Sequence, residues 1–245
     1  MSKKNYFLDP TRASQYDLTR PSFHAKALEY LHKSNPKTRY ERVLDVACGT
    51  GQSSLALAEW TDKVEAIDTS KSMLDHASEH KNINYQVASA EDLPFPANHF
   101  DLIFCASSFH WFKKRVFLAQ AKKCLKPGGK IIIYDSYIIR GLSDKFGEEY
   151  NKRFPAAYDD VKLFDEELQL LGFSKKKIDH FDVITTFTPQ TTAEYFFNLS
   201  NVAAKIEQGE EAKTIHEYLH TLVNQELTGA PIIFQILLTS VEKNV

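Results

Sequence analysis

The chain has 245 residues, of which 43% are hydrophobic and 25% are charged. This length and composition favour one large core with a smaller appendage. Thirty basic residues stand against 32 acidic residues, for a formal net charge of -2. The overall charge therefore argues against a nucleic-acid partner.

Cysteine usage and the apolar tracts indicate a cytoplasmic protein. Cys48, Cys105 and Cys124 are odd in number and lie in or beside apolar segments, as reduced thiols do. The first residues, MSKKNYFLDPTRAS, contain no apolar core of signal-peptide length. The tract PIIFQILL near the end is too short for a membrane span. We therefore expect a monomer or homodimer in the cytoplasm, without a membrane partner.

Helix and strand patterns alternate from residue 22 to about residue 140. A helix is predicted at 22–33, and Pro36 follows it closely. Strand-like runs follow at 42–47, 63–68, 83–89, 100–107 and 130–138, separated by helix-like segments at about 51–60, 70–80 and 112–125. This rhythm predicts βαβ units and a mostly parallel sheet. The KPGG tetrapeptide at 126–129 is predicted to turn the chain from a helix into a strand.

The alternation is lost after about residue 141. Residues 142–173 are predicted to be helical with breaks at Pro155 and Gly172, and residues 177–188 alternate like a strand exposed on one face. Two further helices are predicted at about 191–206 and 210–226, before a last strand at 231–241. This second part must complete the sheet and cover it.

The stretch VLDVACGTGQSSLALA, residues 43–58, passes from a strand through a glycine turn into a helix, which indicates a ligand at the turn. Gly49, Gly51 and Ser54 nearly fit the dinucleotide pattern G-x-G-x-x-G/A. Asp45, however, lies four residues before Gly49, and its carboxylate would oppose a pyrophosphate by kilocalories. A ligand with a positive charge is favoured, and an NAD-dependent oxidoreductase remains an alternative.

Four motifs follow one another over about residues 40–136: VLDVACGTG, VEAIDTSKSML, VASAEDLPFPANHFDLIFCASSFHWF and CLKPGGKIII. With these motifs the sequence resembles the class I S-adenosylmethionine (SAM)-dependent methyltransferases of the methyltransferase type 11 group. HWF further resembles the trans-aconitate methyltransferase-like subgroup. The resemblance implies an α/β fold, Rossmann-like and doubly wound, with a mostly parallel seven-stranded sheet, an antiparallel C-terminal strand and a helical cover. It also implies SAM as cofactor and S-adenosylhomocysteine as product.

We expect a single domain over residues 1–245. Its parts are an N-terminal cap segment at 1–40, a SAM-binding core at 41–140, a helical cover with a sheet-completing strand at 141–228, and the last strand at 229–245. The cover is rich in aromatic residues, which predicts an apolar pocket beneath it for a small-molecule acceptor.

The resemblance assigns roles at the cofactor. Gly49 and Gly51 would let the backbone approach it, and Asp45 would orient its ammonium, directly or through water. Asp68, at the end of the second strand, would accept both ribose hydroxyls, or else cap the helix that starts near Ser70. The remaining expected cofactor contacts are Tyr16, Arg20, Ala47, Thr69, Met73, Ser89, Ala90, Glu91 and Cys105.

Two of these positions depart from the family pattern. Ala47 stands where many members have glycine, and Ser89 stands where many have aspartate. Tyr16 and Arg20 belong to YDLTRP, residues 16–21, which either folds over the cofactor or forms a surface linker. Met73 could equally be ordinary core.

His110, in the HWF motif after the fourth strand, is the candidate catalytic residue. It would act as a base or as a hydrogen-bond donor to the acceptor, or else have a structural role beside Trp111. Methylation of oxygen, nitrogen or carbon is open, and a carboxylate acceptor would need no base. A non-catalytic SAM-binding protein is a further alternative.

HEYLH, residues 216–220, matches the H-E-x-x-H signature of zinc hydrolases. Ile215, Leu219, Leu222 and Val223 already make this segment an amphipathic helix, and Glu242 is the only candidate for a third ligand downstream. We therefore expect two solvent-side histidines and no metal site, with a zinc-dependent hydrolase as the alternative.

Overall fold

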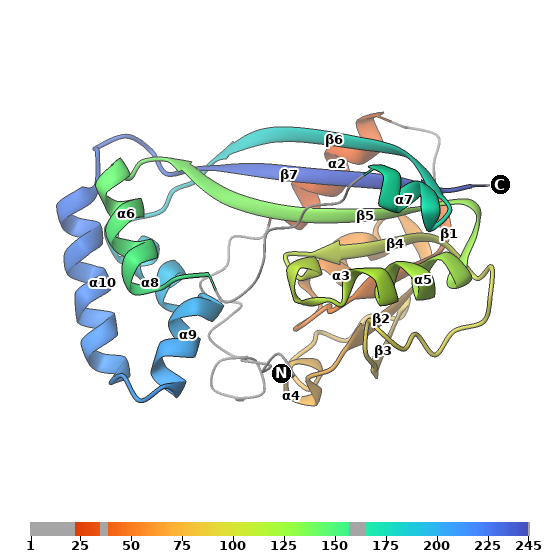
Figure 1. Ribbon diagram of the computed structural model, residues 1–245, viewed down its shortest axis with the longest axis horizontal. Helices are drawn as coiled ribbons and strands as arrows, with labels where there is room; N and C mark the ends of the chain where they lie inside the picture. Colours follow the sequence, from red (N-terminus) through yellow and green to blue (C-terminus); the bar gives the residue numbers. More distant parts are fainter. Residues whose placement is uncertain (1–22, 35–38, 157–164, 245) are drawn as a thin grey trace.

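The computed structural model describes residues 23–34, 39–156 and 165–244 (Figure 1). Its strands form one sheet in the order β3-β2-β1-β4-β5-β7-β6. The strands are β1 (Tyr40–Val46), β2 (Thr61–Asp68), β3 (Ile83–Val87), β4 (Phe100–Ala106), β5 (Leu125–Arg140), β6 (Phe173–Ile184) and β7 (Ile233–Lys243). The first five pair in parallel, and β7 lies antiparallel between β5 and β6. The expected Rossmann-like sheet with an antiparallel last strand is confirmed.

Helices cover both faces of the parallel half, as a doubly wound fold requires. The helices α2 (His24–Ser34) and α3 (Gln52–Ala58) pack on one face. The helices α5 (Lys114–Cys124) and α7 (Asp165–Leu170) pack on the other face. The central strand β1 serves both layers, because consecutive side chains of a strand point to opposite faces. Val43 joins the first layer and Leu44 joins the second, and both are fully buried.

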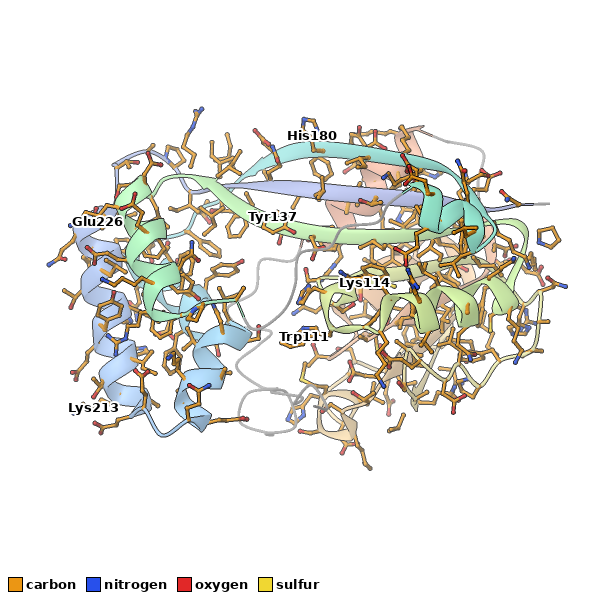
Figure 2. The ribbon with its side chains drawn as sticks, in the orientation of Figure 1. Trp111, Lys114, Tyr137, His180, Lys213 and Glu226 are labelled. Carbon is orange, nitrogen blue, oxygen red and sulfur yellow. The ribbon has the colours of Figure 1, made fainter. Side chains whose placement is uncertain are left out.

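The strands β5, β6 and β7 extend beyond the parallel half and carry a second group of helices at their far end (Figure 1). This group, called here the helical cover, comprises α6 (Asp144–Arg153), α8 (Pro189–Phe197), α9 (Ser200–Glu207) and α10 (Ala212–Glu226). Trp111, from the short 3₁₀ helix η1 (Phe109–Trp111), and Tyr137 of β5 lie between the two parts (Figure 2). No helix in the described ranges is both long and apolar enough to cross a membrane.

Two predicted helices differ from the structure. The segment predicted at 191–206 is divided into α8 and α9, because the Asn198 side-chain amide donates to the Glu194 carbonyl at 3.0 Å and Leu199 is extended. The segment predicted at 70–80 contains only α4 (Lys71–Leu74). Ser70 caps it, its hydroxyl accepting from the Met73 amide. Tighter i to i+3 hydrogen bonds then end the helix.

The KPGG segment lies inside β5 rather than ahead of it. The ladder with β4 moves from the pair Phe100 and Leu125 to the pair Leu102 and Lys130, so residues 126–129 bulge out. Gly128 has φ +74°, which its lack of a side chain permits. The predicted passage from helix to strand is present, but it falls at Leu125, directly after α5, and residues 126–129 form a bulge within the strand.

Candidate active site

A cavity of about 900 Å³ lies between the parallel half and the helical cover. It borders the carboxyl ends of the central strands, where β1 has β2 on one side and β4 on the other. Ligands bind at such a switch point in doubly wound sheets, because the loops after the strands diverge there. The loops after β1, β2 and β4 line one end of the cavity, and the second half of β5 with α6, α8 and α9 lines the other.

The turn after β1 is built on left-handed backbone. Ala47, Gly49 and Gly51 have φ +57°, +57° and +82°. Gly49 lines the cavity, and a Cβ there would lie 3.1 Å from the Met73 Cε. Gly51 does not border the cavity, and a Cβ there would overlap the Tyr85 hydroxyl. The absence of a side chain at Gly51 therefore makes room for Tyr85 of β3, and its expected role in ligand approach stays a prediction.

Asp68 closes β2 and lines the cavity. Its carboxylate accepts the backbone N–H of Gly49 at 2.9 Å through Oδ2 and that of Ser70 at 2.8 Å through Oδ1. Burial raises the pKa of the Asp68 carboxyl, while the backbone donors of Ser70, Gly49 and Thr69 act in the opposite direction. Three donors leave part of the acceptor capacity of the carboxylate open. Asp68 thus fixes the glycine turn and can still accept from a ligand; Ser70, not Asp68, caps α4.

Asp45 is fully buried beneath the first turn of α3. Its Oδ2 accepts the hydroxyls of Ser53 at 2.7 Å and Ser54 at 2.6 Å, whereas its Oδ1 has no hydrogen-bond partner among the described residues. Burial raises the pKa of Asp45 to about 6. Asp45 does not border the cavity. A direct contact with a ligand is therefore not supported, and a contact through water stays a prediction.

The loop after β3 presents Ala90 and Glu91 to the cavity. Ser89 lies behind it: its hydroxyl donates to Glu91 Oε2 at 2.6 Å and accepts the Glu91 N–H at 3.1 Å. The other carboxylate oxygen of Glu91 accepts the Lys113 N–H at 2.8 Å. Ser89 therefore positions Glu91 and is not among the residues that line the cavity, and its expected cofactor contact stays a prediction.

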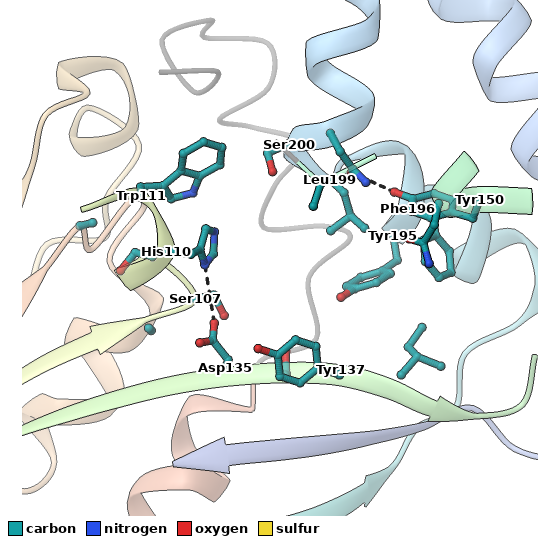
Figure 3. Close-up of a pocket in the computed structure, with 18 of the residues that line it drawn as sticks. Ser107, His110, Trp111, Asp135, Tyr137, Tyr150, Tyr195, Phe196, Leu199 and Ser200 are labelled. Atoms are coloured by element: carbon teal, nitrogen blue, oxygen red, sulfur yellow. Dashed lines mark hydrogen bonds and ion pairs between the residues drawn. The ribbon is translucent and has the colours of Figure 1, made fainter. Parts of the chain in front are cut away.

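His110 stands where the two ends of the cavity meet (Figure 3). Its Nδ1 lies 4.0 Å from Oδ1 of Asp135, an ion-pair distance longer than a hydrogen bond. The two side chains are 11% and 10% exposed. Asp135 comes from β5 and was not identified from the sequence. An acidic residue at the end of the apolar run KIIIY was the available signal, because the carboxyl ends of parallel strands meet at one edge.

The far end of the cavity is aromatic. Tyr137 of β5, Tyr150 of α6, and Tyr195 and Phe196 of α8 line it (Figure 3). The Tyr150 hydroxyl donates to the Asn201 side-chain oxygen at 3.0 Å and so joins α6 to α9. This end combines apolar rings with hydroxyl groups, which suits a small organic molecule.

The other expected contacts divide into three groups. Ala47, Thr69 and Met73 line the cavity. Cys105 does not: its side chain is fully buried in the core beside α5, so its expected cofactor contact is not supported. Tyr16 and Arg20 lie outside the described residues.

Residues 44–133 match a family described as a methyltransferase domain. An uncharacterized methyltransferase of Bacillus subtilis, YcgJ, is 32% identical over 103 residues, which is 39% of this chain and 41% of YcgJ. The match to YcgJ and to two other methyltransferases spans about half of each relative's length, or less.

Solved structures show the same fold. The YcgJ structure superimposes with a TM-score of 0.57 and 19% identity over 91% of this chain and 99% of that chain. Phosphoethanolamine N-methyltransferase 2 of Haemonchus contortus, solved with S-adenosylhomocysteine, gives a TM-score of 0.57 and 20% identity over 90% of this chain and 52% of that chain. The chain therefore has the Rossmann-like fold of these methyltransferase structures, and its residues 44–133 match the methyltransferase-domain family.

Proposed function

We propose that the chain transfers a methyl group from SAM to a small-molecule acceptor. The observation that carries the proposal is the continuity of one cavity. It runs from the glycine turn and Asp68, past His110 and Asp135, to the aromatic end under the helical cover. A cofactor end and an acceptor end meet at a titratable side chain.

The residues at the cofactor end fit an adenosyl ligand. Gly49 presents no side chain where a Cβ would narrow the cavity. Asp68 lines the cavity with acceptor capacity left for a ligand hydroxyl, and Ala90 and Glu91 also line this end. When bound, SAM supplies a methyl group on a good leaving group. The chain's own task is then to align the acceptor and to manage its proton.

His110 is the proposed general base. The Asp135 carboxylate, 4.0 Å from Nδ1, would stabilise the imidazolium that forms when Nε2 takes a proton from the acceptor. A hydroxyl or amine acceptor needs such a base. A carboxylate acceptor would need none and would be repelled by Asp135, which is 8% exposed. We therefore favour a hydroxyl or amine over a carboxylate.

The proposed subgroup is the trans-aconitate methyltransferase-like one. HWF after β4 supports it, since η1 places His110 and Trp111 of this motif at the cavity. This assignment concerns the architecture of the site, while the acceptor follows from the charges around His110.

The test is methyl transfer from SAM with a deuterated methyl group, in metabolite extract, followed by mass spectrometry. We expect at least one extract compound of small mass to gain the labelled methyl group, together with release of S-adenosylhomocysteine. The matched control is His110→Gln. SAM binding without any labelled product would favour a non-catalytic SAM-binding protein and reject the proposal.

A further inference from the structure

The HEYLH segment has a third partner from another helix. His216 and His220 lie one turn apart on α10, and Glu194 comes from α8. Glu194 Oε1 lies 2.7 Å from His216 Nε2 and 3.4 Å from His220 Nε2. The two histidines were expected on the solvent side. Their side chains are half-buried instead, with exposed fractions of 37% for His216 and 28% for His220.

We propose that Glu194, His216 and His220 form a binding site for a divalent transition-metal ion, with Zn²⁺ as the best-fitting ion. This site lies outside the methyl-transfer cavity and is independent of the proposed function. One ligand atom from each residue lies within 4.8 Å of the others. In a tetrahedral zinc site with bonds of about 2.1 Å, neighbouring ligand atoms are about 3.4 Å apart. The separation of His220 Nε2 from Glu194 Oε1 matches that value at 3.4 Å. The separation of His216 Nε2 from Glu194 Oε1 is a hydrogen-bond distance of 2.7 Å, which must lengthen when a metal ion replaces the shared proton.

The surroundings favour a defined position for the ligands. The His216 ring packs edge-on against Phe197, with centroids 5.0 Å apart, and lies 4.5 Å from the His220 ring. Ile215 and Leu219, next to the histidines in sequence, are fully buried and fix α10 against its neighbours. The histidines therefore sit on a helix that is anchored from its other side, and two nitrogens and one oxygen suit zinc.

The arrangement does not suit a hydrolase. In H-E-x-x-H hydrolases the glutamate of the motif acts as base beside the metal. Here the corresponding Glu217 side chain is 66% exposed and forms an ion pair with Lys213 at 3.9 Å. The third ligand comes from Glu194 on α8, so the metal would join two helices of the cover. Because Tyr195 and Phe196 follow Glu194 and line the cavity, the ion would brace that wall.

Zinc binding is tested by titrating ZnCl₂ into the full chain without an affinity tag, after chelator dialysis. We expect one Zn²⁺ per chain. Because metal would bind the folded chain preferentially, we expect Tm to rise by roughly 5–10 °C at a hundredfold excess over Kd. The chain's three cysteines are buried and do not compete in the folded state.

Single substitutions identify the ligands. Glu194→Ala, His216→Ala and His220→Ala each remove a direct ligand, so each should weaken zinc binding by more than the about 100-fold that loss of an outer-shell partner can cost, and should nearly abolish the Tm rise. Two control variants should retain zinc binding and the Tm rise. They are Glu217→Gln within the motif, and His180→Ala on β6, far from α10 (Figure 2). Circular dichroism verifies that each variant is folded. Absence of zinc binding, or binding that survives all three ligand substitutions, would overturn the proposal. Loss of binding in Glu217→Gln would point to a different ligand set and would also overturn it.

Discussion

The distance between His110 and Asp135 predicts how much the rate of methyl transfer should fall when the Asp135 charge is removed. At 4.0 Å, a unit charge on the imidazole and the carboxylate attract each other by about 4 kcal/mol at an effective dielectric constant of about 20. If the proton is about half transferred in the transition state, Asp135 contributes about 2 kcal/mol. Asp135→Asn should therefore lower kcat by about 30-fold.

The assay is a double-mutant cycle with the acceptor identified from the extract. His110→Gln removes the base and should cost about 10²–10⁴ in rate. Once the base is gone, Asp135→Asn has no charge to stabilise, so the double variant should be no slower than His110→Gln. Asp144→Asn, at the exposed rim of the cavity, is the matched control and should change kcat by less than about twofold.

Additive losses in the cycle would refute this reasoning, because they would mean that the two residues act independently. Loss of SAM affinity in His110→Gln, with the fold intact, would place His110 at the cofactor instead. A carboxylate acceptor would also be revealed here, since it would leave the rate of His110→Gln nearly unchanged.

Three further outcomes follow from the geometry. Because the folded-state pKa of Asp45 is raised to about 6, the folded chain keeps a proton between about pH 4 and 6 that the unfolded chain releases, and stability falls as pH rises through this window. The free energy of unfolding of Asp45→Asn, measured in urea without cofactor, should therefore rise by about 1–3 kcal/mol relative to that of the native chain between pH 4 and 7. A difference between the two free energies that stays constant with pH would contradict this. Ala47→Gly relieves a left-handed alanine and should raise Tm by roughly 1–4 °C in calorimetry, whereas Ala121→Gly in α5 should lower Tm. Tyr137→Ala, at a side chain that is 51% exposed, should raise the acceptor KM by about tenfold while the SAM Kd changes by less than about twofold; equal losses of both would show that the cavity does not separate the two ligands.

The sheet, and the positions of Gly49 and Asp68 at the cavity, could be predicted from the sequence because their signals are local. Strand runs and short turns specify βαβ units directly, and Gly49 and Asp68 lie within motifs adjoining strand ends. The side of the sheet to which the Cys105 side chain points could not be predicted in this way. In a central parallel strand both faces are buried, so periodicity does not tell which side chains face a ligand.

Asp135 and Glu194 were missed for a related reason. Each acts with a histidine that lies on a different element: His110 on η1 for Asp135, and His216 on α10 for Glu194. The Asp135 pair forms because β5 extends past the parallel half, and the Glu194 pair forms because α8 packs on α10. Single-sequence patterns specify elements, whereas these sites depend on tertiary packing.

The central claim is tested most directly by calorimetric titration with SAM, S-adenosylhomocysteine and NAD. We expect one saturable site for SAM and for S-adenosylhomocysteine, and no binding of NAD. Asp68→Ala should weaken SAM binding by about 1–3 kcal/mol, since charged hydrogen bonds to a ligand would be lost. Asp62→Ala, at the opposite end of β2 where Asp62 pairs with Arg39 on the surface, should leave SAM binding unchanged. Saturable NAD binding without SAM binding would contradict the account.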